Sequence, residues 1–369
     1  MSATCDDAAE QVTRQLGFDC HDVSPVISVR NPFDLASWTM PVLELLIIVG
    51  AIFALVHAVR RFRGGDPINL ALWFAPLVYL FVTEPPLYFP EWFGLDQQFG
   101  FIFAHNLFTV QFMWDRLPLY IIAIYPALTQ LAYELVRVLG VFRRGALAGS
   151  IAVAFVCQVF YEVFDQLGPQ LKWWAWNDAN QDVNHPMFAS VPMNSMVLFA
   201  SVSFGVMTWL VVRLVGATTG AESRRGWSLT WRIVLAGVLA PPAMSLFGIP
   251  SSIFGGDTPN VTAQAWVLGI ELGLIWIAGA WILVTHLRRR EEPEPLTPFA
   301  KIYPAAYLAV MAVLWVSALP AFLDAKDGIT SDGTPIGSGL YTIACFIGAT
   351  AVLAALNANR RVPVGATGS

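Results

Sequence analysis

Charged residues are scarce in this sequence, and their scarcity excludes most soluble folds. Only 13% of the 369 residues are Asp, Glu, Lys or Arg, whereas a soluble domain needs roughly a quarter. Hydrophobic residues make up 56% of the chain, which includes 14 Trp and 25 Phe. This balance indicates an integral membrane protein.

Recognisable metal, nucleotide and nucleic-acid motifs are also missing. The four cysteines form no CxxC pair, so a zinc or iron–sulfur site is not expected. No P-loop, GxSxG, HExxH or haem-attachment motif occurs, which argues against an ATPase, a hydrolase, a zincin or a cytochrome. No basic stretch with interleaved aromatics suggests nucleic-acid binding. We therefore expect no metal, no cofactor and no nucleic-acid partner.

Long apolar runs fill most of the chain. A spanning helix needs about 20 apolar residues. The runs predict an all-α polytopic membrane protein with about nine transmembrane helices. They cover 39–60, 68–86, 117–139, 145–167, 190–214, 228–249, 264–287, 302–323 and 338–357.

The positive charges alternate from one connection to the next. Clusters of arginine follow every odd-numbered run, whereas the other connections hold Asp and Glu. Because Lys and Arg concentrate in cytoplasmic loops, the N-terminus is predicted outside and the C-terminus in the cytoplasm. The expected location is the inner (plasma) membrane of the cell. The clusters begin at Arg60, Arg143, Arg224, Arg288 and Arg360.

Three regions follow from this topology: an extracytoplasmic segment (1–38), a helical bundle (39–357) and a cytoplasmic tail (358–369). The first segment is acidic, lacks the pattern of a cleavable signal peptide and should lie on the protein. Its Cys5 and Cys20 would share an oxidising compartment and could either pair or stay free.

After its first span, the bundle reads as an array of helical hairpins. The outer connections 87–116 and 168–189 are too long for plain turns. They hold many aromatic residues, so we expect them to form two packed caps.

Acidic residues within the spans are the first candidates for function, because a charge in the membrane costs several kcal/mol. Gln158, Glu162 and Asp165 are spaced i, i+4 and i+7, which predicts one polar stripe along the fourth span. Two carboxylates one turn apart in such a place cannot easily both stay ionised, so we assign a proton to the deeper Glu162. Glu84 ends the second span at a similar depth, and Glu134 can pair with Arg137 on one helix face.

Three tryptophans follow the stripe directly, at Trp173, Trp174 and Trp176. They can form an interfacial aromatic belt, or their rings can line a pocket beside the acids. Indole faces attract cations, so acids beside them would suit protonation of an alkene and shelter of the carbocation that results.

Further polar residues lie in or near the two caps and complete the set of candidates. His105 and Tyr120 accompany the first cap, and Asn194 lies just inside the fifth span after Pro192. We expect Glu162, Asp165 and Glu84 to be catalytic. The substrate-binding residues would be Gln158, Trp173, Trp174, Trp176, Asn194, His105 and Tyr120.

Five of these positions carry a family resemblance. Asp165, Trp174, Trp176, Pro192 and Asn194 resemble a pattern of integral-membrane carotenoid-modifying proteins. These are the bacterioruberin-type carotenoid hydratases and, more remotely, the small-subunit lycopene cyclases. The resemblance implies a helical bundle that acts on isoprenoid double bonds by acid chemistry without a redox cofactor. Where the cyclases carry a Pro-x-Glu-Glu motif this chain reads "PMNS", which argues against cyclase activity in particular.

Three classes of function remain open from the sequence. The first is a membrane enzyme that acts on an isoprenoid or other lipid alkene by acid–base chemistry at an outer-leaflet pocket. The second is a non-catalytic or lipid-binding subunit, with a membrane-protein partner or a second copy of the chain. The third is a proton-coupled transporter, for which Pro241 and Pro242 should break the sixth helix.

Overall fold

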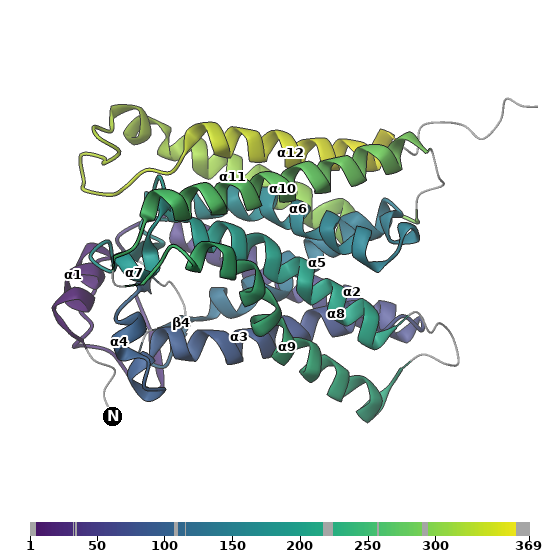
Figure 1. Cartoon of the computed structure of the whole chain (residues 1–369), viewed down its shortest axis with the longest axis horizontal. Coiled ribbons are helices and arrows are strands. Elements are labelled where there is room, and N and C mark those ends of the chain that lie inside the picture. The colour runs from purple at the N-terminus through teal and green to yellow at the C-terminus, as the bar shows by residue number, and fades with distance from the viewer. Residues whose placement is uncertain are drawn as a thin grey trace, which may run out of the picture.

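The computed structural model describes residues 5–31, 33, 35–106, 110–114, 116–216, 224–256, 258–289 and 294–358. Within these residues, nine helices are long and apolar enough to cross a membrane, which confirms the predicted all-α polytopic fold (Figure 1). They are α2 (Met40–Arg63), α3 (Ile68–Tyr88), α5 (Leu119–Val138), α6 (Ala146–Asp165), η4 with α8 (Ser195–Ser203 and Phe204–Val215), α9 (Gly226–Ser252), α10 (Val261–Arg288), α11 (Pro298–Asp324) and α12 (Gly339–Ala358).

Two helices form the centre of the bundle. In α5, 89% of the spanning residues are buried, and in α6, 78% are; in α9 to α12 the buried share is 17–28%. α5 packs against α2, α3 and α6, and α6 packs against α8, α10 and α12. A helix that is apolar all round and buried all round has protein on every face. Most side chains of α5 and α6 therefore face a helix interface or a cavity, although Leu147 at the start of α6 is 63% exposed.

The sixth span differs from its prediction. α9 continues from Gly226 to Ser252 through Pro241 and Pro242. Figure 1 shows the helix bending partway along its length. A proline removes one backbone hydrogen bond and clashes with the preceding turn, which kinks a helix without ending it here. The discontinuous helix that would favour a transporter is therefore not formed at this position.

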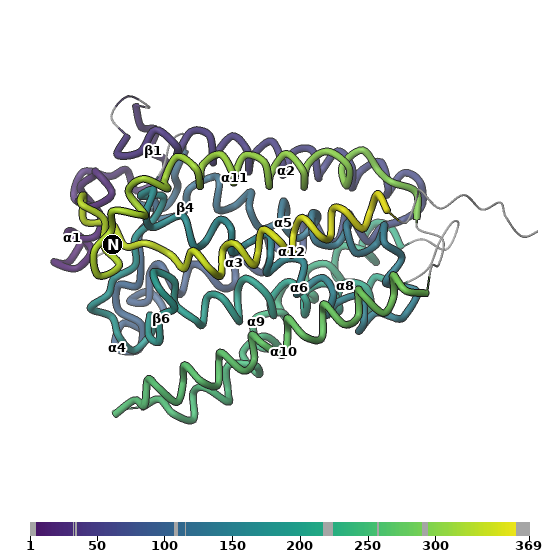
Figure 2. Tube along the Cα trace, turned by 90° about the horizontal axis from the view of Figure 1, so that it is seen from above, coloured from purple at the N-terminus to yellow at the C-terminus, as the bar shows by residue number. Residues whose placement is uncertain are grey.

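Short strands and helices gather at one end of the bundle, which we call the cap end (Figures 1 and 2). β1, β3 and β4 form one small antiparallel sheet, β2 pairs with β5, and β6 pairs with β7. The β2–β5 pair joins the two long connections, with Phe103 opposite Trp176 and His105 opposite Trp174. The elements are α1 (Asp7–Gln15), β1 (Ile27–Val29), η2 (Pro90–Trp92), α4 (Asp96–Phe99), β2 (Phe103–His105), β3 (Val110–Phe112), β4 (Leu117–Pro118), β5 (Trp174–Trp176), α7 (Gln181–Asn184), β6 (Met187–Phe188) and β7 (Val191–Pro192).

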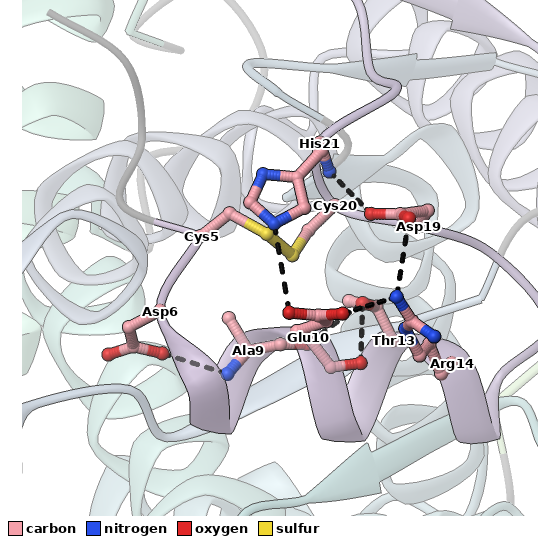
Figure 3. The surroundings of a disulfide bond; sticks show 9 residues. All are labelled: Cys5, Asp6, Ala9, Glu10, Thr13, Arg14, Asp19, Cys20 and His21. Atoms are coloured by element: carbon pink, nitrogen blue, oxygen red, sulfur yellow. Dashed lines mark hydrogen bonds and ion pairs between the residues drawn. A yellow bond between two sulfur atoms is a disulfide. The ribbon is translucent and has the colours of Figure 1, made fainter.

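A disulfide cross-links the N-terminal segment at the cap end. Cys5 and Cys20 form a disulfide that ties the start of α1 to the loop after it (Figure 3). The Asp6 carboxylate accepts a hydrogen bond from the backbone N–H of Ala9 at 2.8 Å and caps the helix. Of the two states that the sequence leaves open for these cysteines, the structure has the paired one.

The opposite end of the bundle, which we call the arginine end, holds a buried ion pair. Glu134 on α5 is fully buried, and Arg137 donates to it from Nε at 2.8 Å and from the guanidinium NH₂ at 2.9 Å. The predicted pairing of these two residues is present.

Candidate functional site

A cavity of about 140 Å³ lies at the cap end, where helices and both caps meet. Its walls come from α3, α5, α6 and η4, and it is covered by β2, β5 and α7. The cavity is lined by six of the residues that the sequence predicted for the site. They are Glu84, His105, Asp165, Trp174, Trp176 and Asn194.

Two carboxyl groups from different helices face this cavity. Glu84 is in the last turn of α3 and is 5% exposed, and Asp165 is the last residue of α6 and is 2% exposed. The Tyr125 hydroxyl donates a hydrogen bond to Oε1 of Glu84. Ser195 Oγ donates to Oδ2 of Asp165 at 3.5 Å, the long limit of such a bond. The cavity thus holds one closely bound carboxyl and one that is weakly held.

Aromatic rings form much of the remaining wall. Trp176 and Phe103 meet edge to face, with ring centroids 5.2 Å apart. The ring centroids of Trp174 and of Phe164 on α6 are 4.7 Å apart. The antiparallel pairing of β2 with β5 brings Phe103 and Trp176 together, since residues directly opposite each other in a ladder are neighbours. The result is an apolar, aromatic-walled space with acids at its edge.

His105 adds a neutral hydrogen-bonding group. Burial lowers the pKa of its imidazole to about 3, because a charged ring would lose its hydration. Its Nδ1 lies 3.2 Å from the hydroxyl of Tyr120, which also reaches the carbonyl of Trp173 at 3.3 Å. Tyr120 does not line the cavity and instead supports the ring that does.

Glu162 does not line the cavity, although it was expected to be catalytic together with Glu84 and Asp165. Its two oxygens accept hydrogen bonds from Gln158 at 3.0 Å and from Gln166 at 3.1 Å. Gln158 also donates to the hydroxyl of Tyr341 on α12 at 3.0 Å. Residues three apart on a helix differ by about 60° around its axis. Both acids are buried, and that angle, together with the link through Gln158 to Tyr341 on α12, places Glu162 on the α12 side of α6 while Asp165 lines the cavity.

Trp173 also lies outside the cavity. Its ring is fully buried and stacks on Phe164, with centroids 5.7 Å apart. Its indole N–H donates to Oγ1 of Thr39, the residue that precedes α2, at 2.9 Å. This tryptophan therefore joins the second cap to the first span, and of the three tryptophans Trp174 and Trp176 line the pocket.

Three hydroxyl-bearing residues of the site were not among the sequence candidates. Tyr125 lies within α5, Tyr161 lies in the last turns of α6, and Ser195 begins η4. The available signal was a hydroxyl inside a spanning helix, which must find a partner in protein because lipid offers none. Tyr161 directly precedes Glu162, and Ser195 directly follows Asn194.

A cluster of side chains of the types that ligate metals lies elsewhere in the described chain. Cys5, Asp19, Cys20 and His21 have ligand atoms within 4.8 Å of one another, and none of them lines the cavity. The disulfide occupies the sulfurs of both cysteines (Figure 3). Metals bind thiolates, so the oxidised segment has no sulfur ligand to offer.

Comparisons with known proteins do not place the chain in a family. No protein-family model, no curated protein and no solved structure matches it.

Proposed function

We propose that this protein is an integral-membrane enzyme that transfers a proton to a double bond of an isoprenoid or another lipid alkene. The observation that carries the proposal is the meeting of Glu84 and Asp165, from two helices, at one aromatic-walled cavity. The resemblance of Asp165, Trp174, Trp176, Pro192 and Asn194 to carotenoid hydratases points the same way.

Asp165 is the acid in this proposal. A hydrogen bond to a carboxylate favours its charged form, and among the described residues Asp165 receives one such bond, from Ser195 at the long limit of 3.5 Å. A buried carboxyl with weak donors keeps its proton more readily. Glu84 then serves as the fixed negative charge of the site, and Asp165 as the donor.

The chemical step balances without a redox partner. The proton of Asp165 goes to one alkene carbon, whose new C–H bond takes the π electrons, and the neighbouring carbon becomes a cation. Water then adds to that cation and returns a proton to the Asp165 carboxylate, so the net reaction is hydration. The faces of Trp174 and Trp176 can stabilise the cation, by up to about 2 kcal/mol each when water is excluded.

The test is exchange of solvent hydrogen into the product. Protein in nanodiscs is supplied with isoprenoid alkenes in D₂O, and deuterium at carbon is measured by mass spectrometry. Asp165→Asn should fold but lose turnover by at least about a hundredfold, the usual scale of general acid catalysis. Glu162→Gln, on the same helix but outside the cavity, is the matched control and should stay active. A fully active Asp165→Asn protein would refute the proposal.

The cap end is proposed to face the outside of the cell. Alternating arginine clusters favour this orientation, and the Cys5–Cys20 disulfide suits an oxidising compartment. Ser331→Cys at the cap end should react with a membrane-impermeant thiol reagent in intact cells. Ser228→Cys at the start of α9 should be shielded until the cells are opened. The reverse labelling pattern would put the site in the cytoplasm.

A non-catalytic, lipid-binding subunit is the main alternative, and purification in mild detergent separates the two. Mass spectrometry of the purified protein should find an isoprenoid lipid under the enzyme proposal. A stoichiometric membrane-protein partner, together with no turnover of any alkene, would favour the subunit.

A further inference from the structure

Another cavity, of about 300 Å³, lies at the arginine end, between α2 and α11. Its walls are the C-terminal turns of α2, the residues just after that helix and the start of α11. Both are spanning helices, and both have one end here. The cavity therefore lies at the depth where the hydrocarbon core of a bilayer gives way to its headgroups.

The charged side chains around this cavity leave one arginine without a partner. Arg61 forms an ion pair with Asp66, and the Nε2 atom of His57 lies 3.2 Å from the buried Glu134. Arg60 lines the cavity and is exposed, and it has no hydrogen bond or ion pair to any residue that the structure describes. The first turn of α11 adds the partial positive charge of a helix N-terminus to the same wall. The cavity therefore favours an anion.

An apolar stripe on α2 leads to this arginine. Leu45, Val49, Ile52 and Val56 are 54%, 59%, 58% and 43% exposed, and Arg60 follows one turn later. Steps of three and four residues place all five side chains on one face of the helix. At 1.5 Å per residue, the four apolar side chains cover about 17 Å, close to half of the roughly 30 Å hydrocarbon thickness of a bilayer. One acyl chain of one leaflet can lie along them.

Two phenylalanines in the cavity wall favour a lipid over a free anion. Phe53 and Phe299 meet edge to face with ring centroids 5.3 Å apart, and both line the cavity. A small hydrated anion would lose water against these rings without a polar partner in return. A phospholipid brings apolar atoms of its glycerol and acyl groups to the same place.

We propose that this cavity binds the phosphate of an anionic phospholipid, with Arg60 as its charge partner and the α2 stripe as the surface for one acyl chain. The planar guanidinium group of an arginine can donate two parallel hydrogen bonds to phosphate oxygens. A zwitterionic lipid carries a positive group near its phosphate, which Arg60 would repel. The site is at the opposite end of the bundle from the cap-end cavity and does not depend on the proposed function.

Lipid preference in detergent tests this inference. The protein is titrated with dioleoyl phosphatidylglycerol or dioleoyl phosphatidylcholine, and lipid-bound states are measured by native mass spectrometry. The first phosphatidylglycerol should bind at least about tenfold more tightly than the first phosphatidylcholine, equivalent to about 1.4 kcal/mol. Arg60→Gln should reduce this preference to about threefold or less, whereas Arg60→Lys, which keeps the charge, should retain more of it.

Arg63→Gln is the matched control. Arg63 lies on the same face of α2, is exposed and does not line the cavity. Its removal takes one positive charge from the same helix end, so the preference for phosphatidylglycerol should stay within about twofold of the wild-type value. Because Arg60 is exposed and has no partner in the described chain, Arg60→Gln should unfold at the wild-type temperature when no lipid is added.

Equal losses of preference in Arg60→Gln and Arg63→Gln would overturn the inference, because the overall charge of the arginine end would then account for the binding. Inorganic phosphate distinguishes a lipid headgroup from a free anion. A large excess of it should leave phosphatidylglycerol bound, and displacement of the lipid would overturn the assignment of the cavity to a phospholipid.

Discussion

The two ends of the bundle differ in how many hydrogen-bond donors surround a buried carboxylate. At the arginine end, Glu134 receives hydrogen bonds from Asn69 at 2.8 Å, from two nitrogens of Arg137 and from Thr297 at 3.2 Å. The Nε2 atom of His57 lies 3.2 Å from the same carboxylate. These partners come from α2, α3, α5 and the residue before α11, so Glu134 links four parts of the bundle.

At the cap end, Asp165 is buried to nearly the same extent but receives, within the described part of the chain, one long hydrogen bond from Ser195. Next to it is a cavity, not an arginine. Both acids would be expensive to place in a membrane, and only one is compensated by protein. The number and closeness of donors therefore distinguish an acid that holds helices together from one that is available to a ligand.

The largest expected effect comes from removing the charge at the arginine end. Glu134→Gln would leave the buried Arg137 with only the more distant carboxylate of Glu294, at 3.7 Å, and breaking a buried pair costs about 3–5 kcal/mol. Thermal unfolding in detergent should show this loss, while Asp165→Asn should change stability by less than about 1 kcal/mol. Equal losses in the two variants would mean that the two ends do not differ as described.

The sequence predicted the spans well because hydrophobicity and length decide them. Each of the nine predicted runs corresponds to a spanning helix, although the fifth begins at Ser195 and not near residue 190. Pro192, which the predicted run 190–214 includes, falls in β7 before the helix, because it pairs with Met187 of β6.

The composition of the site was predictable only in part. Glu84 and Asp165 were among the candidates because ionisable side chains are rare within spans, and Trp174 and Trp176 because they directly follow these acids in the sequence. The pairing of β2 with β5 could not be predicted. It joins residues about 70 positions apart, and backbone hydrogen bonds between such distant residues leave no pattern in the sequence. Glu162 was placed in the site because helical spacing gives relative angles on one helix but not which neighbour each angle faces.

An intermediate effect should appear at the cap end at low pH. Burial lowers the pKa of His105 to about 3, whereas the imidazole of an unfolded chain titrates near 6.5. Between these values the unfolded state binds a proton that the folded state does not, so stability falls as the pH drops below about 6.5. The loss attributable to His105 should reach roughly 2–3 kcal/mol at pH 4.5.

His105→Gln is the matched variant, since its amide cannot take up a proton in this range. The stability difference between pH 7 and pH 4.5, measured by thermal unfolding of both proteins, should be smaller in the variant by that amount. Parallel pH curves for the two proteins would show that the ring is solvated and not part of a dry cavity wall.

The smallest expected effect concerns Glu162, and it separates the two faces of α6. Glu162 accepts hydrogen bonds from the amide groups of Gln158 and Gln166, one turn away on either side. In Glu162→Gln the new side-chain oxygen can still accept one of them, and the new amide nitrogen would face a donor unless a neighbouring glutamine amide turns over. Amide groups can turn in this way, since their oxygen and nitrogen have nearly the same shape. We therefore expect a loss of only about 1 kcal/mol in stability, the usual size of one hydrogen bond. Deuterium incorporation into product should stay within about threefold of the wild-type rate, far from the hundredfold loss expected of Asp165→Asn. If Glu162→Gln instead lost turnover while keeping its stability, the acid would lie on the α12 side of α6, and the chemistry would have to be sought between Glu162 and Tyr341.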